Sequence, residues 1–245
     1  MQDTRDAHEA GKPARIMNAA EELLLKRGFK GVTIADIADR AHIGKGTVYL
    51  YWPTTKSLFL GLLGRSFLGV LDEVVEQIRA RPELVRPDRL CPHMIHGVLA
   101  RPLVRALQTS DADVLGALAD DPRSQQIMDR QGAASLLGGL LPVWRRHGLA
   151  RTDWPLDRQA YALEMLAAGF FATSTRRPSS GSVNAAARDV TLADAIAAVL
   201  GMADVSFDTL DAAALEAIEI LEQAKVALGT SIEPPNRVDD SPQTA

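Results

Sequence analysis

The chain of 245 residues contains one cysteine, Cys91, so it cannot form an internal disulfide bond. It also lacks any run of 18 apolar residues without a charge, and we therefore expect no membrane-spanning helix. The N-terminal sequence, MQDTRDAHEAGKPAR, is polar and of mixed charge and has no apolar segment like that of a signal peptide. Together these absences predict a cytoplasmic protein in a reducing compartment.

Acidic residues are missing between Asp39 and Asp72, a stretch that holds four basic residues: Arg40, Lys45, Lys56 and Arg65. The net charge of the whole chain is −4, but residues 1–56 hold nine Lys or Arg and seven Asp or Glu, whereas the remainder holds 18 and 24. A protein with one DNA-reading end and an acidic remainder has this distribution. The alternative is a gap that arises by chance together with an apolar helix after residue 57.

The first part of the chain has the periodicity of short amphipathic helices. From Ala14 to Arg27 the apolar residues share one face, and Gly28 ends the pattern. A second helix begins after Thr33, because Thr33 and Asp36 match a capping pattern. Its apolar positions follow the spacing i, i+3, i+4, i+7, at Ile34, Ile37, Ala38 and Ala41.

A tight turn at Ile43 and Gly44 leads into a third short helix. In that helix Val48 and Trp52 are spaced i, i+4 and can face the same small core, and Pro53 ends it. A supporting helix followed by helix, turn and helix is the arrangement of helix-turn-helix domains.

Helical periodicity continues through the rest of the chain without a convincing strand pattern, so the predicted fold class is all-α. Long helices are expected from about Thr55 to Ala80 and from Asp121 and Pro122 to His147. The expected organisation is an N-terminal three-helix helix-turn-helix domain and a larger C-terminal helical domain. The predicted boundaries are a flexible arm at 1–13, the helix-turn-helix domain at 14–56, the helical domain at 57–228 and a disordered tail at 229–245.

The segment HIGKGTVYLYWPTTKSLF, residues 42–59, carries the chemistry expected of a DNA-reading helix. Gly44 and Gly46 allow the backbone to approach a phosphate closely, and Lys45 supplies a positive charge. Thr47 and Tyr49 offer hydroxyl groups to phosphates or base edges, and Leu50 can contact a thymine methyl group. The alternative is an ordinary helical hairpin in a core, for which two tyrosines, two glycines and no acids are poor material.

Residues 14–59 resemble the N-terminal domain of the TetR (tetracycline-repressor-like) transcriptional regulators, in AAEELLLKRGFKGVTIADIADRA, in GKGTVYLYWP and in the closing SLF. The resemblance implies a homodimeric, ligand-responsive regulator, usually a repressor, that binds a palindromic operator in double-stranded DNA. It also implies that the C-terminal domain binds ligand and forms the dimer. By position, Thr33 would cap the second helix and reach a phosphate. The implied DNA-facing residues are Lys45, Gly46, Thr47, Tyr49, Leu50 and Tyr51.

The chain departs from the family pattern at two positions. The family commonly has a lysine two residues after the proline, where this chain has Thr55, and the lysine follows one residue later as Lys56. One residue turns a helical side chain by about 100°, so Lys56, which we include among the DNA-binding candidates, would have to snorkel to a phosphate. The family often has a polar residue at the position of Leu50.

Apolar residues spread over the middle helices are candidates for an effector pocket, since such pockets are mostly apolar. The candidates are Met94, Met128, Trp144, Met165 and Phe170, and the alternative for each is plain core. A largely apolar small molecule is the expected effector. The helix near 156–173, with the small residues Ala167, Ala168 and Gly169, and the helix near 192–202 are candidates for the dimer interface. Packing within one chain is the alternative.

No residue set in the sequence predicts catalysis, a cofactor or a metal site. Cys91, His93 and His96 form a C-x-H-x-x-H pattern, but further ligands cannot be identified. An acidic helix N-terminus before Pro122 explains Asp120 and Asp121 without catalysis. We therefore predict a DNA-binding regulator that is not an enzyme. The alternatives are an activator or constitutive regulator without an effector, and an all-α enzyme or lipid carrier with an incidental helix-turn-helix.

Overall fold

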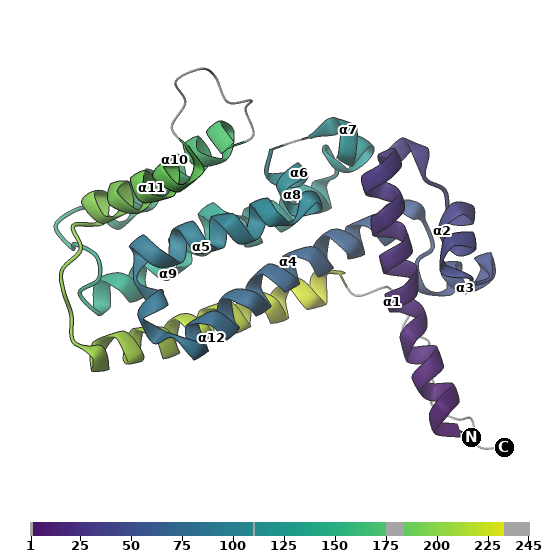
Figure 1. The fold of residues 1–245 in the computed structure, drawn as a ribbon, viewed down its shortest axis with the longest axis horizontal. Helices are drawn as coiled ribbons and strands as arrows, with labels where there is room; N and C mark the ends of the chain where they lie inside the picture. Colours follow the sequence, from purple (N-terminus) through teal and green to yellow (C-terminus); the bar gives the residue numbers. More distant parts are fainter. Residues whose placement is uncertain (1, 110, 175–183, 233–245) are drawn as a thin grey trace.

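The computed structural model describes residues 2–109, 111–174 and 184–232, and every regular element within these ranges is helical (Figure 1). The all-α prediction is therefore confirmed. The N-terminal domain comprises α1 (Gln2–Arg27), the 3₁₀ turn η1 (Phe29–Gly31), α2 (Ile34–Ala41) and α3 (Lys45–Tyr51). None of the described helices is long and apolar enough to span a membrane.

A larger helical region follows the first three helices. Its first elements are α4 (Thr55–Ala80), η2 (Pro82–Val85), α5 (Pro87–Ala100), α6 (Pro102–Gln108), α7 (Ala112–Leu115) and η3 (Gly116–Leu118). Its later elements are α8 (Pro122–Gln131), α9 (Ala133–Arg146), α10 (Leu156–Ser174), α11 (Ala185–Leu200) and α12 (Phe207–Ile232).

The larger region is layered along α4, the helix that leaves the N-terminal domain (Figure 1). Helix α12 lies beside α4, α5 and α9 form the next layer, and α10 and α11 cover these two on the other side. Buried apolar side chains fill the layers, among them Phe67, Leu71 and Ile78 of α4. The indole of Trp144 in α9 is fully buried and donates a hydrogen bond from Nε1 to the Val85 carbonyl, over 2.9 Å.

The predicted cap of α2 is confirmed. The Thr33 hydroxyl accepts a hydrogen bond from the Asp36 N–H at 3.2 Å, and the Asp36 carboxylate accepts one from the Thr33 N–H at 2.9 Å. All four residues expected on the inner face of α2 are buried: Ile34, Ile37, Ala38 and Ala41. The local sequence thus determines both where α2 begins and which face it buries.

Three expectations about helix ends were wrong or incomplete. The helix expected from residue 122 to 147 is two helices, since Gly132 adopts an extended conformation at the start of α9. Residues 2–13, expected in a flexible arm, form the first turns of α1; their alanines and early acidic residues favour a helix start. Helix α12 continues to Ile232, four residues into the expected tail, while residues 233–245 lie outside the described ranges.

Candidate nucleic-acid interface

Helix α3 has one buried and one exposed side, as its spacing predicts. Val48 is fully buried and Trp52, just after the helix, is 3% exposed, so both side chains belong to the hydrophobic core. On the other side Tyr49 and Leu50 are 51% and 56% exposed. Lys45 and Gly46 are also exposed, and α3 contains no acidic residue. The result is a small exposed surface with one cation, a phenol and an aliphatic side chain.

Two of the expected DNA-facing residues are less open. Thr47 and Tyr51 are half-buried, and the Tyr51 ring lies 5.8 Å from the Trp52 ring, centroid to centroid, at the edge of the core. A contact between either residue and DNA remains a prediction. Thr33 is exposed, but its hydroxyl already serves in the cap of α2.

Hydrogen bonds and a neighbouring charge stabilise the ionised Asp36 carboxylate at the start of α2. Hydrogen bonds from the Thr33 side chain and backbone, followed by the charge of Arg27, hold the pKa of Asp36 below its usual range. The Arg27 guanidinium lies 3.3 Å from the Asp36 carboxylate, which links the end of α1 to the start of α2. A carboxylate at this end of a helix also interacts favourably with the helix dipole.

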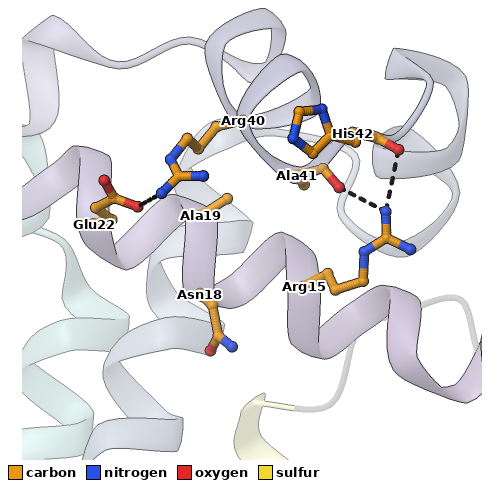
Figure 2. Close-up of a pocket in the computed structure, with 7 residues that line it drawn as sticks. All are labelled: Arg15, Asn18, Ala19, Glu22, Arg40, Ala41 and His42. Atoms are coloured by element: carbon orange, nitrogen blue, oxygen red, sulfur yellow. Dashed lines mark hydrogen bonds and ion pairs between the residues drawn. The ribbon is translucent and has the colours of Figure 1, made fainter.

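The corner between α2 and α3 is held by a side chain that we did not single out from the sequence. The Arg15 guanidinium of α1 donates hydrogen bonds to the carbonyls of Ala41 and His42, at 2.8 and 3.2 Å (Figure 2). His42 has a positive φ of 54° there, which is uncommon for a residue other than glycine. Arg15 thereby satisfies carbonyls left unpaired at the C-terminus of α2.

A shallow hollow of about 250 Å³ lies beside this corner, between α1 and α2 (Figure 2). Arg40 lies on its rim, and its guanidinium pairs with the Glu22 carboxylate at 2.5 Å. Glu22 also pairs with Lys26, and the hydrogen bonds from these two cations hold the pKa of Glu22 below its usual range. Glu22 therefore balances only part of the positive charge that Arg15, Arg40 and Lys26 bring to this place.

Lys56 lies in the first turn of α4, where it faces the larger helical region. Its ammonium nitrogen is 2.6 Å from Oδ2 of Asp121, whose side chain is 2% exposed, while the Lys56 side chain is 41% exposed. In this arrangement the ammonium group is occupied by a carboxylate of the same chain. A phosphate contact by Lys56, as expected from the sequence, would require that this ion pair open.

The five candidates for the effector pocket do not gather at one place. Met94 and Trp144 are buried in the core, and nothing is described for the Met128 side chain. Met165, 58% exposed, and the half-buried Phe170 line a surface groove of about 390 Å³ between α10 and α11. The apolar period of the sequence cannot distinguish these environments, because core and interface residues share it.

Other chemically suggestive residues lie apart from one another. Cys91 is fully buried, and this burial raises the pKa of its thiol. Burial lowers the pKa of His93, and His96 pairs with Asp189 of α11 at 3.1 Å. Among the described residues no group of three or more His, Cys, Asp or Glu side chains is placed to hold a metal ion.

Buried polar groups without partners were not anticipated. The Gln159 side chain in α10 is fully buried, and neither its amide nitrogen nor its amide oxygen has a hydrogen-bond partner. The Ser124 hydroxyl in α8 is in the same condition. Such groups are uncommon in folded proteins and call for a specific explanation. Gln159 follows Asp157 and Arg158 in the first turn of α10, so the local sequence gives no signal that its side chain is buried.

Residues 16–62 match the model of the family described as bacterial regulatory proteins, tetR family. An uncharacterized HTH-type transcriptional regulator of Mycobacterium tuberculosis is 34% identical over 116 residues, which are 43% of this chain and 61% of that relative. The HTH-type transcriptional repressor BepR of Brucella suis is 24% identical over 163 residues, 63% of this chain and 76% of that relative. The chain thus spans about three fifths of the length of the Mycobacterium relative.

A crystal structure assigned to the tetR family, from Shewanella sp. PV-4, has a TM-score of 0.50 and 20% identity to this chain. The likeness covers 79% of this chain and 99% of that one, and at this identity it bears on the fold alone. The family match covers α1 from Ile16, α2, α3 and the start of α4, which are the elements that build the surface around Lys45. The N-terminal domain of this chain is thus similar to the family of bacterial regulatory proteins, tetR family.

Proposed function

We propose that this protein is a cytoplasmic DNA-binding transcriptional regulator and that α3 is its recognition helix. The observation that carries this proposal is the exposed side of α3, where Lys45, Gly46, Tyr49 and Leu50 face outward while Val48 holds the helix to the domain. A lysine beside a glycine suits a phosphate contact, because the backbone can approach closely. The exposed phenol and aliphatic side chain suit base edges and a thymine methyl group in the major groove.

A second copy of the chain is the proposed occupant of the outer face of α10 and α11. Four large apolar residues on these helices are exposed, namely Leu156, Tyr161, Met165 and Val190, with exposed fractions of 45% to 62%. The groove between the two helices is lined mostly by apolar side chains. A face of this kind favours symmetric pairing, which would present two α3 helices to a palindromic operator.

We further propose that the regulator is a repressor released by a largely apolar effector. Gln159 supports this part, because a buried amide without a protein partner is a hydrogen-bonding group available to a ligand. Such a ligand would reduce the population of the conformation that binds DNA. It can do so only as far as it binds the other conformation more tightly.

Selection of bound duplexes from a random pool, followed by fluorescence anisotropy with the selected duplex, tests the proposal. The wild type should bind with a strong dependence on salt, and Lys45→Ala should lower the slope of log affinity against log salt by about one for each subunit contact. Tyr49→Ala should weaken binding without lowering the melting temperature, because the side chain is half exposed. Protein that binds no duplex at low salt would overturn the proposed function.

A further inference from the structure

An ion pair joins the N-terminal domain to the larger helical region. Lys56, in the first turn of α4, places its ammonium nitrogen 2.6 Å from Oδ2 of Asp121, at the N-terminus of α8. The first turn of α4 follows α3 after only three residues, Trp52, Pro53 and Thr54. Trp52 is buried, so the short connection between α3 and Lys56 is anchored at its first residue.

Capping of α8 uses only one of the two oxygens of the Asp121 carboxylate. Its Oδ1 accepts a hydrogen bond from the Arg123 N–H at 2.7 Å, and its backbone carbonyl accepts one from the Gln125 N–H at 3.1 Å. The other oxygen, Oδ2, lies 2.6 Å from the Lys56 ammonium nitrogen and also accepts a longer hydrogen bond, of 3.5 Å, from Nη2 of Arg123. Burial raises the pKa of Asp121, but the hydrogen bonds from Lys56 and Arg123 lower it by more than burial raises it. The pKa of Asp121 therefore lies below the usual range. The buried carboxylate is therefore ionised and needs its cations.

Three other contacts join the N-terminal domain to the larger helical region. Phe29 of η1 lies edge-on to Phe59 of α4, with ring centroids 5.5 Å apart, and a Cβ added at Gly116 would lie 2.8 Å from the Phe29 Cβ. A Cβ added at Gly28 would lie 2.7 Å from the Asp113 carbonyl oxygen. Both glycines have positive φ, 67° at Gly28 and 50° at Gly116, so the close approach depends on them.

We propose that the Lys56–Asp121 ion pair holds α3 in the orientation that binds DNA, and that Lys56 is a positioning residue rather than a phosphate ligand. The inference rests on the proposed function, because it requires α3 to be the recognition helix. The packed contacts at Phe29 and Gly28 fix where the segment from Asp113 to Asp121 meets the N-terminal domain. The ion pair adds a contact between the first turn of α4, which follows α3 in the chain, and the N-terminus of α8.

The two neutral variants of this pair separate the two roles of Lys56. Asp121→Asn removes the charge but keeps an oxygen that can accept the Arg123 N–H, so the cap of α8 survives. Lys56→Met keeps the aliphatic stem and removes the ammonium. If Lys56 positions α3, both variants should weaken DNA binding. If Lys56 contacts a phosphate, only Lys56→Met should weaken it, while Asp121→Asn should leave affinity unchanged or raise it by freeing the lysine.

The experiment measures affinity for the selected duplex at several salt concentrations for the wild type, both single variants and the double variant. We expect each single variant to bind the duplex roughly three- to thirtyfold more weakly than the wild type. The double variant should bind no more weakly than the single variant with the lower affinity. The slope of log affinity against log salt should stay that of the wild type. Lys30→Met, which removes an exposed lysine of η1, is the matched control and should match the wild type.

Three results would overturn the inference. The first is a salt slope lowered by about one in Lys56→Met together with unchanged or tighter binding by Asp121→Asn. The second is additive losses in the double variant. The third is a lower melting temperature of both single variants with unaltered affinity of the folded protein, since that would leave the pair a purely structural role. Failure of the wild type to bind any duplex would instead overturn the proposed function, so the two failures are distinguishable.

Discussion

Replacement of Gln159 by methionine should stabilise the protein. The side chain is fully buried in α10, and both ends of its amide lack hydrogen-bond partners. A buried polar group left without a partner costs about 1–3 kcal/mol, because it loses water and gains nothing in return. Methionine is unbranched and similar in length, so it can fill the same space without the amide.

The expected gain in the free energy of unfolding is therefore about 1–2 kcal/mol, allowing for imperfect packing of the thioether. For a protein of this size, each kcal/mol raises the melting temperature by roughly 2–4 °C. Urea unfolding followed by circular dichroism should show a higher midpoint with an unchanged m-value, because the surface exposed on unfolding stays the same. Gln125→Met, at an exposed position of α8, is the matched control and should change stability by less than about 0.5 kcal/mol.

A fall in stability of Gln159→Met would refute this reasoning, because it would mean that the amide makes favourable hydrogen bonds in solution. The same pair of variants also tests the proposed effector site. A small molecule that binds only the native state raises the melting temperature, and the rise should shrink in Gln159→Met if the amide contacts that molecule. An equal rise in the wild type and in Gln159→Met would place the ligand elsewhere.

Further variants probe the helix cap and the proposed dimer. Thr33→Ala should lower the free energy of unfolding by about 1 kcal/mol, measured by urea unfolding, because it removes the side-chain acceptor of the α2 cap. Met165→Glu should convert a dimer to a monomer in size-exclusion chromatography with light scattering, since it places a charge on the exposed apolar face of α10; an unchanged mass would place the interface elsewhere. The lowered pKa of Asp36 means that its contribution to stability is present above the unfolded pKa and is lost as the pH falls through the folded pKa. The stability difference between wild type and Asp36→Asn should therefore shrink below about pH 4, and a difference that stays constant with pH would contradict the assignment.

Features that depend on neighbours in the sequence could be predicted. The cap formed by Thr33 and Asp36 involves residues three positions apart, and the burial of Val48 and Trp52 follows from one helical turn. The spacing of residues within a helix determines which side chains lie close together, because hydrogen bonds and side-chain directions repeat with the helical period. The exposed side of α3 follows directly, since it is what remains when the buried side is assigned.

Contacts between distant parts of the chain could not be predicted in this way. Arg15 reaches the carbonyl of Ala41, 26 residues later, and nothing in the local pattern of either segment indicates the pairing. Lys56 meets Asp121 across an even longer separation, and from the sequence Asp121 is fully explained as a helix cap. Helix packing decides which charged side chains meet, and a periodic pattern specifies only which face is apolar.

The effector residues show the same limit for apolar side chains. Met94 and Met165 have the same chemistry and both lie in amphipathic helices, but Met94 is 2% exposed and Met165 is 58% exposed. An apolar position predicts contact with something apolar, and that partner can be the core, a ligand or a second copy of the chain. The break at Gly132 was missed for a related reason, because a single glycine inside a helical pattern is usually tolerated.

Local charge, rather than net charge, is compatible with DNA binding by this acidic protein. Residues after position 56 hold 24 acidic and 18 basic residues, but several of the acids are paired there, as Glu73 is with Arg101 and Asp72 with Lys225. At about 0.1 M salt, unpaired charges act over roughly 10 Å, so a distant acidic surface hardly repels a duplex that touches α3. The acidic surface of the larger helical region does repel DNA that approaches that region. The segregated charges would thus orient the encounter, and Lys45, on a helix without acids, keeps its charge available for a phosphate.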